Sequence, residues 1–271
     1  GYLHRVISWT PKGFGWEADP KHVEMMVEEM GLEGENVKGA ATPASKDTGK
    51  NDDTVLDSLQ GSARSRFCSV GGRGLYLSLD RPDTMFAMRQ ITAELSSPTV
   101  LGELRLKRLV RYLKTYPRLV WHFAYQSSSA SVNVWVDSDW AGCRVTRKST
   151  SGGIVMWGLH ALEAYSSSQQ TVALSSGEAE FYAQGKGGAY ALFMKYVLIE
   201  LGFLEAKAKI GILSDSTAAK GIANRLGSGK VRHLETRYLW LQEKTLNGDL
   251  EVVRWERRTR ATCLRRRCRK G

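Results

Sequence analysis

The sequence has few cysteines and no long apolar run. Four cysteines in 271 residues cannot form a disulfide framework, so we expect an intracellular, reducing compartment rather than secretion. The longest apolar stretch, Ala189 to Leu204, contains Lys195 and Glu200 and falls short of the roughly 20 residues that cross a bilayer. No membrane partner is therefore expected. An apolar share of 42% and a charged share of 25% exclude wholesale disorder.

Acidic residues are also scarce, with 28 Asp and Glu against 39 Lys and Arg, for a net charge of +11. Residues 254–271 hold eight Arg and one Lys against Glu256, so this tail carries +8 and the preceding 253 residues only +3. The basicity therefore belongs mainly to the tail. A basic tail is typical of a nucleic-acid-binding arm, but it can equally be an artefact of translation.

Residues 1–126 are expected to form one region. The apolar pattern predicts a strand over 6–9, a turn from Pro11 to Gly15 and a helix over 19–30. Residues 38–65 are polar and without periodicity, which predicts a loop or linker. A further helix is predicted from Ser97-Pro98 to Thr115, with a buried stripe formed by Leu101, Leu104, Leu109 and Leu113.

The same helix carries a basic stripe formed by Lys107, Arg108, Arg111 and Lys114. Two interpretations remain open for it. The stripe can contact nucleic-acid phosphates, or it can be an ordinary solvated face.

Residues 127–255 are expected to form a second, α/β domain. Strands are predicted over 132–136, 153–157, 160–166, 210–213 and 250–255, and helices over 176–202, 217–225 and 234–246. Three strands in succession, then a helix and a further strand with its helix, predict a mixed sheet flanked by helices.

Three carboxylates stand out by position in this domain. Asp137 follows the first strand, Asp215 follows the fourth, and Glu180 lies in the first turns of the long helix. Sites in open α/β sheets form beside strand ends, and clustered carboxylate oxygens favour Mg²⁺ or Mn²⁺. A structural interpretation competes with this one, in which Asp137 and Asp215 end strands and Glu180 begins a helix.

Several motifs resemble one family, the Pol polyproteins of copia-type retrotransposons. Four of them are similar to signatures of its ribonuclease H domain: Asp137 to Gly142 (DSDWAG), Arg147 to Gly152 (RKSTSG), Ser166 to Glu180 (SSSQQTVALSSGEAE) and Lys230 to Tyr238 (KVRHLETRY). Residues 64–121, which include Arg81-Pro82-Asp83, resemble the segment that connects reverse transcriptase to that nuclease. The polymerase's paired-aspartate motif is absent from the sequence, so we expect a C-terminal fragment of such a polyprotein.

The resemblance implies a ribonuclease H-like fold and metal-dependent cleavage of the RNA strand of RNA–DNA hybrids. Asp137, Glu180 and Asp215 would hold Mg²⁺, or Mn²⁺ in its place. Glu180 is preferred to Glu178 because Ala179-Glu180-Phe181 matches the family pattern. His233 would either steady the substrate or lie on a helix surface. The implied partners are an RNA–DNA hybrid and the rest of the polyprotein, with its reverse transcriptase and integrase.

The sequence departs from the family after the last strand. The family carries a fourth carboxylate on a final helix, whereas residues 256–271 contain no aspartate and no apolar periodicity. One hypothesis is that this tail is translated out of frame, and the other is a genuine arginine-rich arm. Loss of the fourth carboxylate predicts weak or absent activity. The alternative function is a catalytically inactive nucleic-acid-binding remnant or a pseudogene product.

Overall fold

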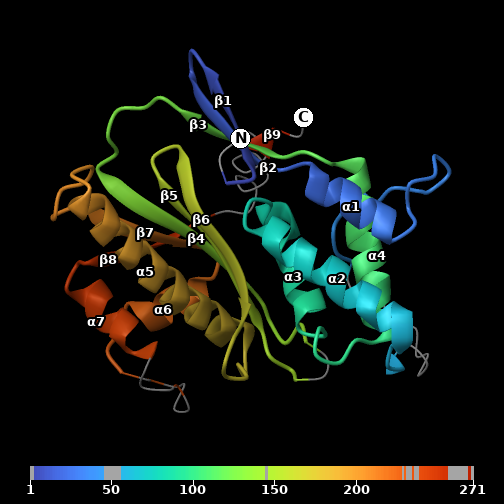
Figure 1. Ribbon diagram of the computed structural model, residues 1–271. Coiled ribbons are helices and arrows are strands. Elements are labelled where there is room, and N and C mark those ends of the chain that lie inside the picture. The colour runs from blue at the N-terminus through green and yellow to red at the C-terminus, as the bar shows by residue number, and fades with distance from the viewer. Residues whose placement is uncertain are drawn as a thin grey trace. The chain divides into compact units, whose positions relative to one another are not determined.

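The computed structural model describes residues 3–45, 56–143, 146–227, 229, 234, 238–255 and 268–269 (Figure 1). The chain divides into two compact units. One comprises Gly1–His122 with Arg266–Gly271, and the other comprises Phe123–Arg265.

The first unit is mostly helical and also contains a small sheet. Its helices are α1 (Lys21–Glu29), α2 (Gly61–Ser78), the short 3₁₀ helix η2 (Pro82–Thr84), α3 (Met85–Thr92) and α4 (Val100–Thr115). The sheet has the order β1-β2-β3-β9, formed by β1 (Arg5–Thr10), β2 (Gly13–Ala18), β3 (Val120–Ala124) and β9 (Cys268–Arg269).

Strand β2 corrects the turn predicted from Pro11 to Gly15. Gly13 already pairs with Thr10, so β1 and β2 form a tight hairpin. A Cβ atom at Gly15 would lie 2.6 Å from Ser8 Oγ and 2.9 Å from Val120 Cγ1. Glycine at this position therefore permits close packing between strands, and it does not mark a turn.

Two further expectations for the first unit are corrected. Helix α2 begins at Gly61, inside the segment predicted to be a loop. The prediction missed this start because the glycines and serines of α2 interrupt the apolar periodicity that marks a helix. In α4 the buried apolar residues include Leu106, Leu109 and Leu113, whereas Leu104 is 54% exposed. The buried face of α4 is thus rotated from the predicted stripe.

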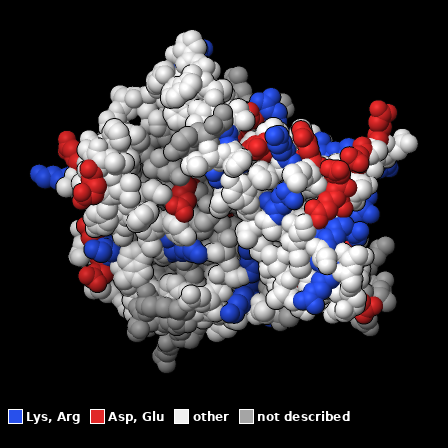
Figure 2. Space-filling model, in the orientation of Figure 1, with Lys and Arg blue, Asp and Glu red and all other residues white. Residues whose placement is uncertain are grey.

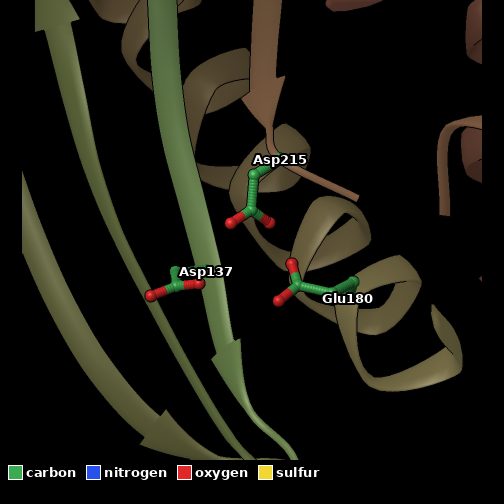
Figure 3. A group of neighbouring side chains, drawn as sticks. All are labelled: Asp137, Glu180 and Asp215. Atoms are coloured by element: carbon green, nitrogen blue, oxygen red, sulfur yellow. The ribbon is translucent and has the colours of Figure 1, made fainter. Parts of the chain in front are cut away.

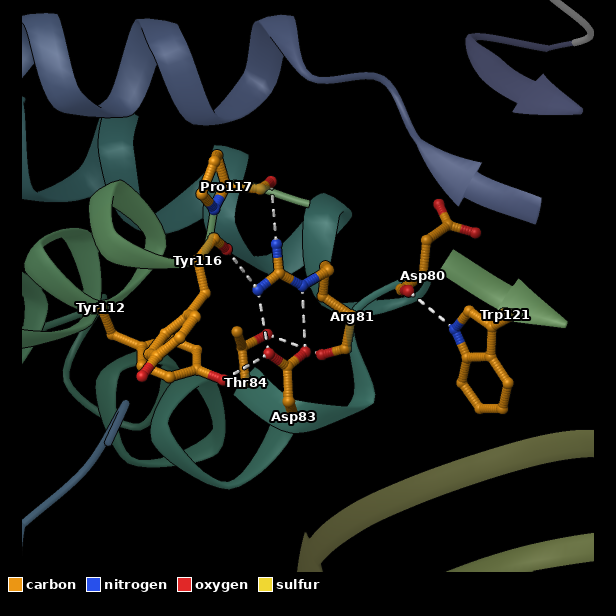
Figure 4. Close-up of polar contacts among 8 residues, drawn as sticks. All are labelled: Asp80, Arg81, Asp83, Thr84, Tyr112, Tyr116, Pro117 and Trp121. Atoms are coloured by element: carbon orange, nitrogen blue, oxygen red, sulfur yellow. Dashed lines mark hydrogen bonds and ion pairs between the residues drawn. The ribbon is translucent and has the colours of Figure 1, made fainter. Parts of the chain in front are cut away.

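A buried arginine ties the helices of this unit together (Figure 4). Arg81 is 1% exposed, and its guanidinium donates to both carboxylate oxygens of Asp83 at 3.0 and 2.9 Å. It also donates to the carbonyl oxygens of Pro117 at 3.1 Å and Tyr116 at 2.9 Å. Tyr112 donates its hydroxyl to Asp83 at 2.8 Å, and burial raises the pKa of this phenol. The Arg81-Pro82-Asp83 motif therefore anchors the end of α4.

The second unit is a mixed five-stranded sheet with flanking helices, which confirms the predicted fold class. The strand order is β6-β5-β4-β7-β8, formed by β4 (Ser131–Asp139), β5 (Thr150–Trp157), β6 (His160–Ser168), β7 (Lys209–Ser214) and β8 (Leu250–Arg254). Strands β4, β5 and β6 pair antiparallel, whereas β4, β7 and β8 pair parallel. The helices are α5 (Ser176–Glu200), α6 (Thr217–Ala223) and α7 (Trp240–Leu246), and α7 begins later than the predicted residue 234.

Helix α5 packs closely across the sheet. Val132, Val134 and Val136 of β4 form a core with the buried side of α5. A Cβ atom at Gly187 would lie 2.3 Å from Val136 Cγ1, so glycine lets the helix approach β4. This close packing places the first turns of α5 beside the ends of β4 and β7.

Candidate metal centre

Three carboxylates from three elements meet at one edge of the five-stranded sheet (Figure 3). Asp137 lies near the end of β4, Asp215 follows β7 directly, and Glu180 lies in the second turn of α5. One oxygen from each lies within 4.8 Å of the other two. Because β4 and β7 are parallel, their carboxyl ends reach the same edge. The structure thus brings together the three residues proposed from the sequence.

The strands separate where the carboxylates lie. Pairing between β4 and β7 ends at Trp135 and Leu213, whereas β4 continues to Asp139 paired with β5 alone. Backbone groups of β4 beyond Trp135 are therefore available on the β7 side. The backbone N–H of Ser138 is one of these groups, and it donates to a side chain of α5.

That side chain is Glu180. Its Oε1 accepts from Ser138 N at 3.0 Å and from Ser138 Oγ at 3.1 Å. Its Oε2 is buried and has no hydrogen-bond partner in the described part of the chain. Burial raises the pKa of Glu180 to about 7; the Ser138 backbone hydrogen bond opposes this rise, and the negative charges of Asp137 and Asp215 add to it. A cation between the three carboxylates would relieve both the burial and the repulsion.

Glu178 has a different role from Glu180. Ser175 Oγ accepts from Glu178 N at 3.2 Å, and Glu178 Oε2 accepts from Leu174 N at 2.9 Å. Tyr182 donates its hydroxyl to Glu178 Oε1. These contacts cap the start of α5. Glu178 is therefore engaged at the helix terminus, and Glu180 is the glutamate beside Asp137 and Asp215.

A buried glutamine supports the centre and was missed from the sequence. Gln169 is 5% exposed, and its Nε2 donates to Ser151 Oγ at 2.9 Å and to Ala179 O at 2.8 Å. Its backbone N–H donates to Ser149 O at 2.8 Å. Ser151 lies opposite Ser138 in the register of β4 and β5. Gln169 therefore fixes the helical turn that carries Glu180 against the sheet. The polar Gln169-Gln170 pair between a strand and a helix was the available signal.

The basic stripe of α4 lies in the other unit. Lys107, Arg108, Arg111 and Lys114 are all half-buried. Lys114 Nζ donates to Leu32 O at 2.9 Å and Gly34 O at 2.6 Å, and Arg108 donates to Thr42 Oγ1 at 2.8 Å. On the face shown in Figure 2, basic side chains of this unit alternate with acidic ones. Part of the stripe is thus engaged within the fold. His233 lies outside the described residues.

Comparison with known proteins gives relatives among retrotransposon Pol polyproteins. No protein-family model matches the chain. The chain is 28% identical over 191 residues to the retrovirus-related Pol polyprotein from transposon RE1 of Arabidopsis thaliana, covering 70% of this chain and 13% of that protein. It is 26% identical over 243 residues to the Pol polyprotein from transposon TNT 1-94 of Nicotiana tabacum, covering 88% of this chain and 18% of that protein. The chain is thus similar to the Pol polyproteins of retrotransposons over most of its length.

One solved structure is also similar in fold. The foamy viral protease-reverse transcriptase, solved in complex with dsDNA, is similar at a TM-score of 0.52 and 9% identity, over 93% of this chain and 45% of that chain. The second unit has the mixed five-stranded sheet and flanking helices of a ribonuclease H-like fold. The chain spans less than a fifth of either Pol polyprotein relative. No described helix combines the length and apolar character needed to cross a membrane.

Proposed function

We propose that this Pol polyprotein segment hydrolyses the RNA strand of RNA–DNA hybrids in a metal-dependent reaction, at a low rate. The observation that carries the proposal is the convergence of Asp137, Glu180 and Asp215, with oxygens within 4.8 Å of one another at the end of the sheet. The proposed partners are the hybrid and the remainder of the polyprotein, including reverse transcriptase and integrase.

The donor set fits a hard divalent cation. All three side chains offer carboxylate oxygens, which favour Mg²⁺, or Mn²⁺ in its place, over zinc. The buried and unbonded Oε2 of Glu180 supplies a ligand atom that no protein donor satisfies in the described part of the chain. When bound, such a cation would stabilise charge on the phosphate oxygens and make water a better nucleophile.

Residues of this chain hold the three carboxylates in position before a cation binds. Asp137 and Asp215 are held by two strands of one sheet, so their separation is set by the backbone. The two hydrogen bonds from Ser138 fix one oxygen of Glu180 and leave the other for the cation. Gln169 in turn fixes the helical turn that carries Glu180.

The low rate follows from the number of carboxylates. The family places a fourth carboxylate on a final helix, and residues 256–271 contain Glu256 but no aspartate. Three carboxylates offer fewer ligand oxygens to a divalent cation than four, so we expect weaker metal binding.

The test is cleavage of a 5′-labelled RNA–DNA hybrid by the chain and by Asp137→Asn, with Mg²⁺ and with a chelator. We expect slow RNA cleavage that needs Mg²⁺ and disappears in Asp137→Asn. Cleavage that survives either change would refute the proposal. Rapid turnover abolished by Asp137→Asn would refute the predicted impairment. Retention of the hybrid without cleavage in Mg²⁺ would instead support the nucleic-acid-binding remnant.

A further inference from the structure

A half-buried lysine lies between helix α5 and the edge strand β6. Lys186 Nζ donates to Ser167 Oγ. The same atom lies 5.6 Å from the ring centroid of Tyr165 and 5.9 Å from that of Tyr190. The two rings stack with centroids 4.6 Å apart. Lys186 is therefore held in place by a hydroxyl group and two aromatic rings.

This lysine has no ion-pair partner within the part of the chain that the structure describes. Its described contacts are a neutral hydroxyl and aromatic rings. Burial lowers the pKa of Lys186 because the ammonium loses part of its hydration. A partly desolvated cation is costly unless an anion lies beside it. The position is consequently suited to an anionic ligand.

Lys186 lies near the carboxylate centre and on the same side of the sheet. Ser167 pairs in register with Ser151, and Ser151 pairs with Ser138, which holds Glu180. Ser138 and Ser167 both contact α5, so both hydroxyls face that helix. Two strand spacings separate them, a distance of about 10 Å. A nucleic acid bound at the carboxylates would carry further phosphates at this range.

We propose that Lys186 and Ser167 form a second binding site, which takes one backbone phosphate of the nucleic acid held at the carboxylate centre. The inference rests on the proposed function for its ligand. Lysine binds phosphate as a point charge, and serine hydroxyls donate to phosphate oxygens. The stacked tyrosines keep the ammonium from turning away, and Ser167 aligns it.

The experiment measures binding of the full chain to a 20-base-pair RNA–DNA hybrid over a series of KCl concentrations, with a chelator to prevent turnover. Lys186→Gln should weaken binding about five-fold and should reduce the magnitude of the slope of log K against log salt by about 0.7 to 0.9, which is the loss of one phosphate contact. Ser167→Ala should weaken binding by a smaller factor. Lys186→Arg, which keeps the charge, should restore the slope.

Lys209→Gln is the matched control. Lys209 is exposed and begins β7, at the end of the sheet opposite to Asp215. The substitution removes the same charge, so we expect it to leave the slope unchanged. Equal slopes for Lys186→Gln and Lys209→Gln would overturn the inference, and so would an absence of hybrid binding by the wild type.

The two proposals fail in different ways. Cleavage with an unchanged slope in Lys186→Gln would overturn the phosphate site alone. A reduced slope without any cleavage would support the phosphate site and count against the hydrolase. If Lys186→Gln does not fold by circular dichroism, Ser167→Ala and Lys186→Arg decide the outcome, because each retains part of the contact.

Discussion

Replacing Glu180 by glutamine removes a carboxylate whose pKa is raised to about 7 and leaves a side chain of nearly the same size. Burial causes most of the rise, and the charges of Asp137 and Asp215 add to it. In the unfolded chain the pKa returns to its ordinary value of 4.5. The folded protein therefore binds this proton more tightly than the unfolded chain does.

The sign of the pH dependence follows from that difference. The stabilisation is complete below about pH 4.5 and is lost as the pH rises through about 7, because the unfolded chain then releases the proton more readily. At 1.36 kcal/mol per pKa unit the loss is roughly 3 kcal/mol, and solvent screening reduces it to about 2 kcal/mol. Without metal, the wild type should thus lose about 2 kcal/mol relative to Glu180→Gln between pH 5 and pH 8.

Divalent metal should reverse this loss, because it binds the ionised carboxylate. Urea unfolding at pH 5 and pH 8, with a chelator and with about 10 mM Mg²⁺, measures the free energy of unfolding under each condition. We expect Mg²⁺ to stabilise the wild type much more at pH 8 than at pH 5, and to stabilise Glu180→Gln little at either pH. If the metal-free wild type and Glu180→Gln show the same pH dependence, burial and the neighbouring carboxylates do not raise the pKa of Glu180 as argued.

Three further substitutions, two of them with a matched control, test the packing around the centre and in the helical unit. Gln169→Met and Gln242→Met each remove a buried amide that donates to two acceptors and should each cost about 1–3 kcal/mol, but only Gln169→Met should weaken Mg²⁺ binding in a calorimetric titration. Arg81→Met should cost about 3 kcal/mol in urea unfolding, because it leaves a half-buried carboxylate unpaired; a cost below about 1 kcal/mol would contradict this. Gly187→Ala should cost about 1–3 kcal/mol by overpacking, whereas Gly221→Ala, which meets open space, should be neutral or slightly stabilising.

The second unit was predicted well because its sequence patterns are local. Strand β4 alternates strictly between buried and half-buried residues over 131–136, which is the period of a strand with one face on a core. Asp137 lies near the end of β4 and Asp215 follows β7 directly, so the parallel pairing of these strands brings both carboxylates to one edge. The choice between Glu178 and Glu180 depends on helical phase, since residues two apart point to different sides of a helix.

The first unit was predicted less well because its packing relies on glycine. Gly15 lies in a strand, and α2 carries glycines on its buried side, so neither segment shows the apolar period that marks an element. The misplaced Leu104 has a similar origin. Apolar residues follow one another closely in α4, so the sequence is compatible with more than one buried face. The structure selects the face that includes Tyr112 and Leu113, both of which are buried.

Gln169 was missed for a different reason: the sequence marks it as a polar position, but its role depends on contacts between elements. Its amide spans β5 and α5, and Ser138 spans β4 and α5, so the helix that carries Glu180 is held at two points on one side of its first turns. Ser138 lies beyond Trp135, the last residue of β4 that pairs with β7, and Ser151 lies opposite Ser138 on β5. The extension of β4 past β7 therefore does two things at once. It separates the strands enough for three carboxylates to approach, and it supplies the donor that orients one of them.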